Sequence, residues 1–190
     1  MRAYKIVATV LTCLLVAATV GWTQGAAERE TQTGLKTTGE IYAAEAELSY
    51  AMADIAKAKD EFPAALQKLM DDTTKAGLTP LGPGQIVIAG IMPPDPAGKI
   101  TLELQLPVIE QATDNDLKGD TGVKLIKLEP TLVAFTFHKG GLLDLQTTFM
   151  RLFQWAQASG KEISGAPTIV LYKPPSEDGS MVAELQLPVK

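Results

Sequence analysis

The sequence predicts an α+β fold of two βαββ modules related by a pseudo-twofold axis, with antiparallel sheets and one main helix in each module. Two observations lead to this prediction. The string ELQLPV occurs twice, with Glu103 and Glu184 as its first residues, and a Pro-Pro pair precedes each copy. Residues 47–90 also align with residues 130–173 without a gap, at an offset of 83 positions. A repeat unit of this size is longer than a solenoid repeat and indicates a duplicated module.

Each module is expected to begin with a strand. This strand is predicted at Glu47–Ile55 in module one and at Pro130–His138 in module two, where the β-branched and aromatic residues of TLVAFTF are typical of strands. Two further strands, joined by loops rich in proline and glycine, complete each module. They are expected at 85–90 and 100–107 in module one, and at 168–172 and 181–188 in module two.

A helix is predicted between the first two strands of each module. Its apolar residues recur at helical spacing and form one stripe. The stripe consists of Phe62, Leu66, Leu69 and Met70 in module one, and of Leu145, Phe149, Leu152, Phe153 and Ala156 in module two. Gly77 and Gly160 are expected to end the two helices, because glycine tolerates the left-handed conformation that often follows a helix C-terminus.

Residues 1–27 have the pattern of an export signal. Arg2 and Lys5 precede the apolar run Ile6–Val20, and small residues follow it. This order is typical of a secretory signal peptide; an uncleaved anchor is the alternative, because about 20 apolar residues span a bilayer. In both cases the rest of the chain is expected outside the cytoplasm, periplasmic or secreted, with membrane contact only through an uncleaved N-terminal segment.

Composition also divides the remaining chain. Residues 28–44 are expected to form a flexible tether, because their first part is polar and lacks an apolar period. The predicted domain covers residues 45–190. It consists of module one at 45–108, an acidic polar linker at 109–121 and module two at 122–190.

Charge and residue counts exclude several functions. The formal net charge of −5 provides no basic surface for phosphate backbones, so no nucleic-acid partner is expected. Cys13 is the only cysteine and His138 the only histidine, which excludes an intrachain disulfide and a Cys/His zinc site. No metal site and no cofactor are expected. His138 itself is interpreted as a surface or strand-end histidine.

The repeated strand has one apolar and one polar face. Because side chains alternate along a strand, one face carries Ala183, Leu185 and Leu187 and the other carries Val182, Glu184 and Gln186. The leucines are expected to pack under the helix of the module. The polar residues either face water or, if the two modules associate about a pseudo-twofold axis, line a groove between them. A carboxylate in such a groove would attract a cation or act as a base.

Four segments resemble those of a known family. They are PTLVAFTFHKGG, LLDLQTTFMRLFQWAQASG, GAPTIVLYKPP and AELQLPV. Over residues 45–190 their order resembles the GyrI-like small-molecule-binding superfamily, which includes the effector-binding domains of AraC- and MerR-type bacterial transcription activators. The resemblance implies paired βαββ modules around a central groove. No helix-turn-helix motif precedes the domain, so a stand-alone exported form without DNA-binding activity is expected.

The resemblance also indicates ligand-binding residues. It implies that Glu184 lies on the groove floor and Tyr172 on its wall, with Glu103 at the corresponding place in module one. Gln186 shares the polar face of Glu184. Trp155 lies off the apolar stripe of its helix, and we expect it either to contact the groove or the other module, or to remain partly exposed near Arg151.

The leading hypothesis is an exported domain that binds a small organic molecule, apolar and neutral or cationic, in a groove between the modules. One alternative is a hydrolase of reactive small molecules in which Glu184 is catalytic, because some members of the superfamily hydrolyse small molecules. The other alternative is an envelope module whose sheet edges bind a protein partner. No oligomeric state is predicted.

Overall fold

The computed structural model describes residues 32–90, 98–109, 123–173 and 180–190. The expected leader at 1–27 lies outside these residues, as does the expected linker apart from Ile109. Within the described residues, no helix combines the length and the apolarity that crossing a bilayer requires.

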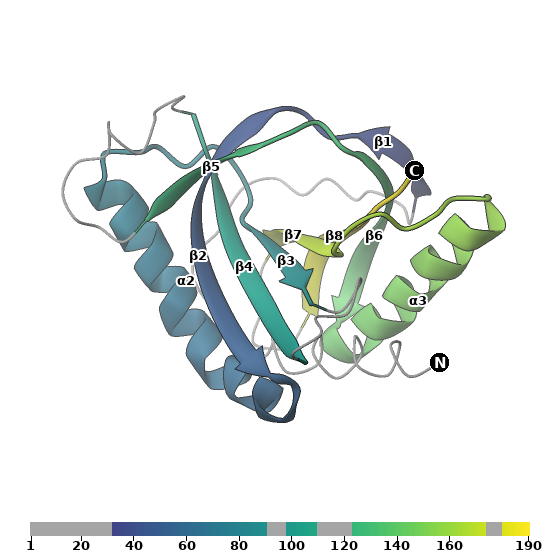
Figure 1. Cartoon of the computed structure of the whole chain (residues 1–190), viewed down its shortest axis with the longest axis horizontal. Helices are drawn as coiled ribbons and strands as arrows, with labels where there is room; N and C mark the ends of the chain where they lie inside the picture. The colour runs from purple at the N-terminus through teal and green to yellow at the C-terminus, as the bar shows by residue number, and fades with distance from the viewer. Residues whose placement is uncertain (1–31, 91–97, 110–122, 174–179) are drawn as a thin grey trace.

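Eight described strands form one sheet in the order β1-β6-β8-β7-β3-β4-β2-β5, and all neighbouring pairs are antiparallel (Figure 1). The strands are β1 (Thr33–Thr37), β2 (Ile41–Ala51), β3 (Gln85–Ala89), β4 (Lys99–Val108), β5 (Lys124–Leu128), β6 (Leu132–Gly141), β7 (Thr168–Lys173) and β8 (Ser180–Pro188). The described helices are α2 (Ala58–Lys75), which follows the 3-10 turn η1 (Met52–Lys57), and α3 (Leu142–Ala158). The predicted α+β class, with an antiparallel sheet and one main helix in each half, is confirmed.

The strand order is symmetric about the central pair, β3 and β7. In this pair Ile86 lies opposite Ile169, and these two residues occupy equivalent positions at the predicted offset. Moving outwards, β4 corresponds to β8, β2 to β6, and β5 to β1. Because an antiparallel pair has a local twofold axis between its partners, this order is what a pseudo-twofold arrangement requires.

The strands that precede β2 and β6 in the chain, β1 and β5, lie at the two edges of the sheet, each in the other half. β1 precedes β2 in the chain but pairs with β6, and β5 precedes β6 but pairs with β2. The two connections meet where the Thr131 backbone N–H donates to Thr38 Oγ1 at 2.9 Å and the Thr38 backbone N–H donates to the Thr131 carbonyl at 2.9 Å. Residues 33–37 form β1 and residues 41–44 belong to β2. This corrects the flexible tether expected over residues 28–44.

The first strand of module one also lies earlier than predicted. β2 is Ile41–Ala51 instead of Glu47–Ile55. Glu103 lies opposite Glu47, whereas Glu184 lies opposite Phe137, so Glu47 corresponds to Phe137 and the gapless offset of 83 is wrong for this strand. The reason is η1, whose extra residues separate β2 from α2, whereas β6 runs directly into α3.

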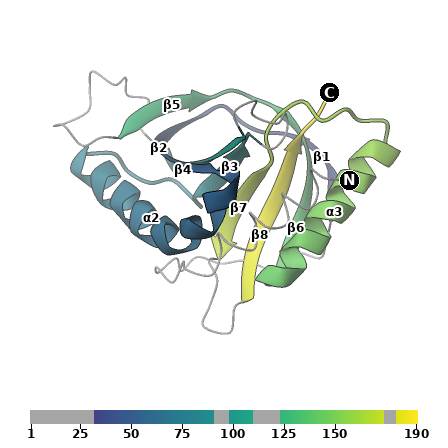
Figure 2. The ribbon, with the colours of Figure 1, turned by 60° about the horizontal axis from the view of Figure 1, so that its bottom comes forward.

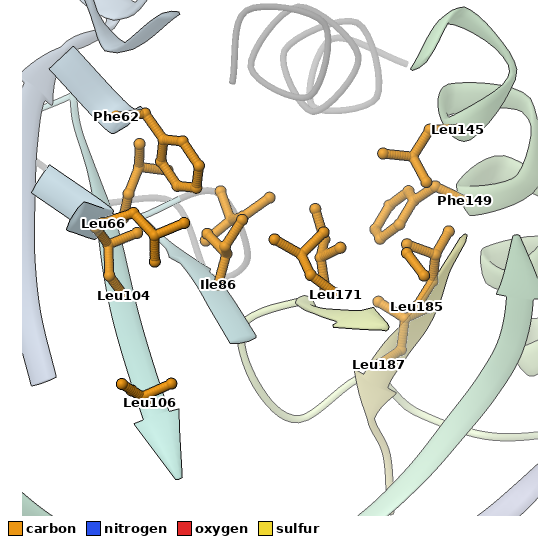
Figure 3. Packing of buried hydrophobic residues seen from close by; sticks show 14 of the residues in the cluster. Phe62, Leu66, Ile86, Leu104, Leu106, Leu145, Phe149, Leu171, Leu185 and Leu187 are labelled. Carbon is orange, nitrogen blue, oxygen red and sulfur yellow. The ribbon is translucent and has the colours of Figure 1, made fainter. Parts of the chain in front are cut away.

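Both helices pack on the same face of the sheet. Cross-strand partners such as Ile86 and Ile169 point to the same side. They belong to one apolar cluster that includes Phe62 of α2 and Phe149 of α3 (Figure 3). The leucines of the repeated strands lie in this cluster, as predicted: Leu102, Leu104 and Leu106 from β4, and Leu185 and Leu187 from β8. His138 also points to this face; it is 3% exposed, with Nδ1 at 3.0 Å from Thr148 Oγ1 of α3, so the surface or strand-end interpretation is wrong.

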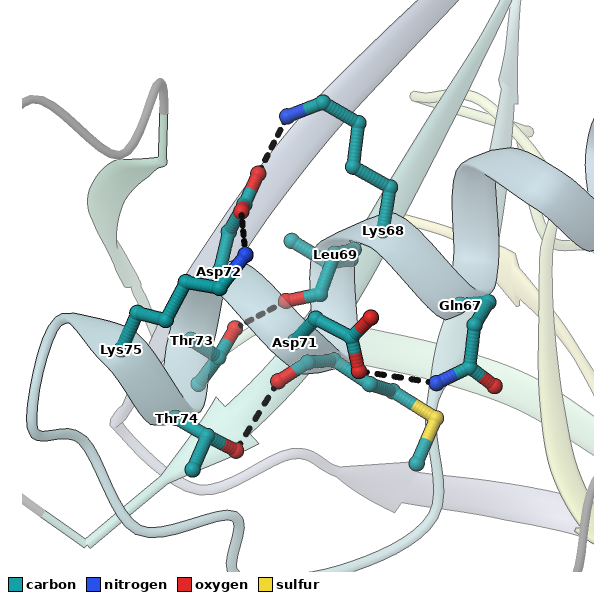
Figure 4. A network of polar contacts seen from close by, with 9 residues as sticks. Gln67, Lys68, Leu69, Asp71, Asp72, Thr73, Thr74 and Lys75 are labelled. Atoms are coloured by element: carbon teal, nitrogen blue, oxygen red, sulfur yellow. Dashed lines mark hydrogen bonds and ion pairs between the residues drawn. The ribbon is translucent and has the colours of Figure 1, made fainter.

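The C-terminal half of α2 is held by contacts within the helix (Figure 4). Lys68 and Lys75 pair with Asp72, and the Lys68 side chain lowers the pKa of that carboxyl. The Thr73 hydroxyl donates to the Leu69 carbonyl at 2.6 Å. Cations one turn away offset the unfavourable position of a carboxylate near a helix C-terminus. The helix then ends at Gly77 with φ 81°, as α3 does at Gly160 with φ 70°, which agrees with the predicted stops.

Candidate functional site

The candidate site lies on the sheet face that no described helix covers, on strand β8. Glu184 is opposite Phe137 of β6 and Val170 of β7, so its side chain points away from α3. Its neighbours still enclose it: Glu184 is 1% exposed and Gln186 is 8% exposed. These two side chains therefore do not simply face water. In Figure 2, β6, β8 and β7 lie side by side.

Both carboxylate oxygens of Glu184 have partners. Oε1 forms an ion pair with Lys36 Nζ and accepts a hydrogen bond from Gln186 Nε2 at 2.6 Å. Oε2 accepts a hydrogen bond from the Tyr172 hydroxyl at 3.4 Å. Burying a charge is costly unless it is paired and hydrogen-bonded, and these three contacts explain how a carboxylate is kept inside the sheet surface.

Three described aromatic rings, those of Phe135, Phe137 and Tyr172, lie near the ion pair of Lys36 and Glu184. The centroids of Phe135 and Phe137 are 6.0 Å apart in an edge-to-face arrangement, and those of Phe137 and Tyr172 are also 6.0 Å apart. Lys36 Nζ lies 5.0 Å from the Phe135 centroid, within cation–π range. We call Lys36, Phe135, Phe137, Tyr172, Glu184 and Gln186 the Glu184 cluster.

Local strand geometry explains how these side chains converge. Phe135 and Phe137 alternate with Thr136 along β6 and lie directly opposite Gln186 and Glu184. Tyr172 lies where the pairing of β7 with β8 shifts register, between Leu171 and Lys173. A bulge of this kind redirects a side chain. β1 then supplies Lys36, which lies opposite Val133 on the same face.

Module one has a polar cluster at the corresponding place, which we call the Glu103 cluster. Gln105 Nε2 donates to Glu45 Oε2 at 3.0 Å and is 3.4 Å from Glu103 Oε2. Lys124 Nζ lies 3.1 Å from a Glu45 oxygen and 3.9 Å from a Glu47 oxygen. Gln85 Nε2 also donates to Gln105 Oε1 at 2.9 Å. The cluster consists of Glu45, Glu47, Gln85, Glu103, Gln105 and Lys124.

The surroundings of Glu103 disfavour its negatively charged form. Partial burial raises the pKa of Glu103, and the nearby carboxylates of Glu45 and Glu47 raise it further, while Lys124 acts in the opposite direction. The Glu45 side chain in turn raises the pKa of Lys124. Among the described residues, the Glu103 cluster thus contains three carboxylates, those of Glu45, Glu47 and Glu103, and one lysine, Lys124.

The structure brings together some of the predicted site residues and separates others. Glu184, Gln186 and Tyr172 are in contact. Glu103 lies on the same face of the sheet but in its own cluster. Trp155 packs against the apolar core from α3, on the helix-covered face, so the structure does not bring it to Glu184.

Lys36, Phe135 and Phe137 are additional residues of the site that were not predicted. The alternation of Phe135 and Phe137 in TLVAFTF placed them on one face, and this signal could have identified them. Lys36 carried no such signal, because its contact with Glu184 depends on the pairing of β1 with the far half of the sheet.

Comparison with known proteins agrees with this fold. A family model described as the GyrI-like small molecule binding domain matches residues 40–190. The comparison with curated proteins finds no match. Among solved structures, the C-terminal domain of EcmrR has a TM-score of 0.64 at 16% identity, over 84% of this chain and 98% of that chain.

Two further structures show the same fold at low identity. A hydrolase from Listeria innocua has a TM-score of 0.60 at 16% identity, over 84% of this chain and 92% of that chain. SAV2435, in a structure bound to tetraphenylphosphonium, has a TM-score of 0.56 at 12% identity, over 84% of this chain and 94% of that chain. The family model covers most of the chain, and the resemblance inferred from the sequence is confirmed: this chain belongs to the GyrI-like small molecule binding domain family.

Proposed function

We propose that the Glu184 cluster binds a small apolar organic cation. The observation that carries this proposal is the buried carboxylate: Glu184 is 1% exposed and lies among the rings of Phe137 and Tyr172. A carboxylate in apolar surroundings attracts positive charge more strongly than one in water does. Aromatic faces add both apolar contact and cation–π attraction.

The comparisons support the same class of ligand. Family membership supports a small molecule as the partner. The structure of SAV2435, which has this fold, is bound to tetraphenylphosphonium, an apolar cation. We further propose that the domain acts without binding DNA, because the net charge of −5 disfavours contact with phosphates.

Isothermal titration with tetraphenylphosphonium tests this proposal. Glu184→Gln keeps the shape of the side chain but removes its charge and replaces one acceptor oxygen with an NH2 donor, so we expect the affinity to fall about tenfold or more. Glu103→Gln is the matched control, because it makes the same change in the other module, and we expect an effect below about twofold. Neutral triphenylphosphine oxide should bind the wild type and Glu184→Gln with similar affinity. Equal affinity of the wild type and Glu184→Gln for the cation would contradict the charge role.

Hydrolysis is a second candidate function of the same cluster. The Tyr172 hydroxyl lies 3.4 Å from Glu184 Oε2, so an acid and a base are adjacent, as general acid–base catalysis requires. A protein with this fold is described as a hydrolase. Turnover of p-nitrophenyl acetate should then be lost in both Glu184→Gln and Tyr172→Phe. Turnover that survives both substitutions would exclude this mechanism.

We also propose that the domain functions outside the cytoplasm. Support comes from the charged start, apolar run and small residues of the segment 1–27. An alkaline phosphatase fused after residue 40 should be active in bacterial cells, because this enzyme folds only where disulfides form. Deleting Ile6–Val20 should abolish that activity, and activity that persists would contradict export.

A further inference from the structure

Lys36 is a partly exposed partner of the buried Glu184 carboxylate. It belongs to β1, which lies at the edge of the sheet and, among the described strands, pairs only with β6. The Lys36 side chain is 35% exposed, whereas that of Glu184, its partner in the ion pair, is 1% exposed. A flexible lysine can move its ammonium group into water without a change in the backbone. The Lys36 ammonium can therefore leave the buried Glu184 carboxylate while the backbone stays in place.

The Lys36 ammonium already makes the contacts that the proposed ligand needs. It forms an ion pair with Glu184 Oε1 and lies 5.0 Å from the centre of the Phe135 ring. An organic cation bound at the same carboxylate would use the same oxygen and the same ring. The ammonium and such a ligand cannot both occupy this position.

We propose that Lys36 is a tethered cation that holds the charge position of the Glu184 cluster and that an organic cation must displace it in order to bind. This inference rests on the proposed function. A group tethered this closely has an effective concentration on the order of millimolar or higher. Simple inorganic cations at lower concentration do not displace it, because they gain no apolar contact in exchange. Lys36 thereby selects for cations with a large apolar surface.

The same competition lowers the apparent affinity of the wild type. A ligand binds only the fraction of molecules in which Lys36 has left the carboxylate, so its apparent dissociation constant is raised in inverse proportion to that fraction. Removing the ammonium group should remove this competition. Lys36→Met is the suitable change, because methionine keeps an unbranched apolar chain but carries no charge.

Titration of tetraphenylphosphonium into the wild type, Lys36→Met and Lys127→Met tests the proposal. Lys127 is the matched control, a lysine of similar exposure on the other edge strand, where it pairs with Glu40 and Glu129. We expect Lys36→Met to bind the cation about tenfold more tightly than the wild type, and Lys127→Met to bind within about twofold of it. The double variant Lys36→Met/Glu184→Gln should lose the gain.

The outcomes separate this inference from the proposed function. If wild-type binding depends on Glu184 but Lys36→Met binds no more tightly than the wild type, the tethered-cation inference is wrong and the proposed function stands. If no folded variant binds the cation, the proposed function fails and this inference fails with it.

A measurement on the wild type covers the case in which Lys36→Met does not fold. Reductive methylation followed by mass spectrometry reports how accessible each lysine amine is. Saturating tetraphenylphosphonium should increase the labelling rate of Lys36 by about threefold or more and leave that of Lys127 unchanged, because displacement exposes the Lys36 amine. A rate for Lys36 that stays constant or falls would overturn the proposal.

Discussion

The Glu103 and Glu184 clusters both contain the first residues of the repeated hexapeptide ELQLPV, but the surroundings of the two glutamates differ. Glu184 is almost fully buried, among aromatic rings and one lysine. Glu103 is only partly buried, and this burial together with the nearby carboxylates of Glu45 and Glu47 raises its pKa. The difference lies in the neighbouring strand: Phe137 lies opposite Glu184 on β6, and Glu47 lies opposite Glu103 on β2.

The next pair along the strands repeats the contrast. Gln186 lies opposite Phe135, whereas Gln105 lies opposite Glu45. The repeated strand therefore determines which face carries Glu and Gln, and the cross-strand partners determine whether aromatic rings or further carboxylates surround them. This contrast is why we propose the Glu184 cluster, and not the Glu103 cluster, as the site for an organic cation.

On the helix-covered face the two halves should respond alike. Leu104 and Leu185 correspond in the repeat and are 1% and 0% exposed. Replacing either with alanine removes buried methyl groups and leaves a cavity, so each change should lower the free energy of unfolding by about 3 kcal/mol. Urea denaturation measures this, with Leu81→Ala as a control at a residue that is 54% exposed. Values for the two core variants that differ by more than about 2 kcal/mol would show that the halves are not equivalent on this face.

The two edge-strand lysines, Lys36 on the uncovered face and Lys127 on the opposite face, should respond differently. Without ligand, Lys36→Met leaves the buried Glu184 carboxylate without its cation, and we expect the free energy of unfolding to fall by about 2 kcal/mol. Lys127→Met should have a much smaller effect, because its ion pairs with Glu40 and Glu129 are exposed. Thermal or urea unfolding of the two variants checks this difference. The double variant Lys36→Met/Glu184→Gln should recover part of the loss; no recovery would mean that Lys36 stabilises the fold by packing alone.

The smallest effect is expected at Glu103 and depends on pH. The pKa of Glu103 is higher in the folded state than its ordinary value of 4.5. Protonated Glu103 therefore stabilises the fold, and this contribution is complete at pH values below 4.5. It is lost as the pH rises through the raised pKa of the folded state. At pH 7, Glu103→Gln should therefore raise the free energy of unfolding, by less than about 1 kcal/mol because solvent screens a half-exposed group. The gain should shrink near pH 4. Urea unfolding at both pH values tests the sign, and a variant less stable than the wild type at pH 7 would contradict the account.

Local patterns predicted much of the fold. The α+β class, the helix stripes and the leucine faces of β4 and β8 follow from periods of 3.6 and 2, which act over a few residues. The same period placed Glu184 and Gln186 together on one face. Contacts between segments far apart in the chain were less accessible, and so the first strand of module one and the role of residues 33–37 were predicted wrongly.

The sequence by itself determined which side chains share a face, because alternation along a strand and spacing along a helix are local properties of the chain. Only the tertiary structure decided what those faces meet. The exchange of β1 and β5 between the halves brings Lys36 to Glu184, and the turn η1 changes the register of β2 relative to α2. Strand pairing over such distances is selected by the packing of the whole sheet, and no short period in the sequence records it.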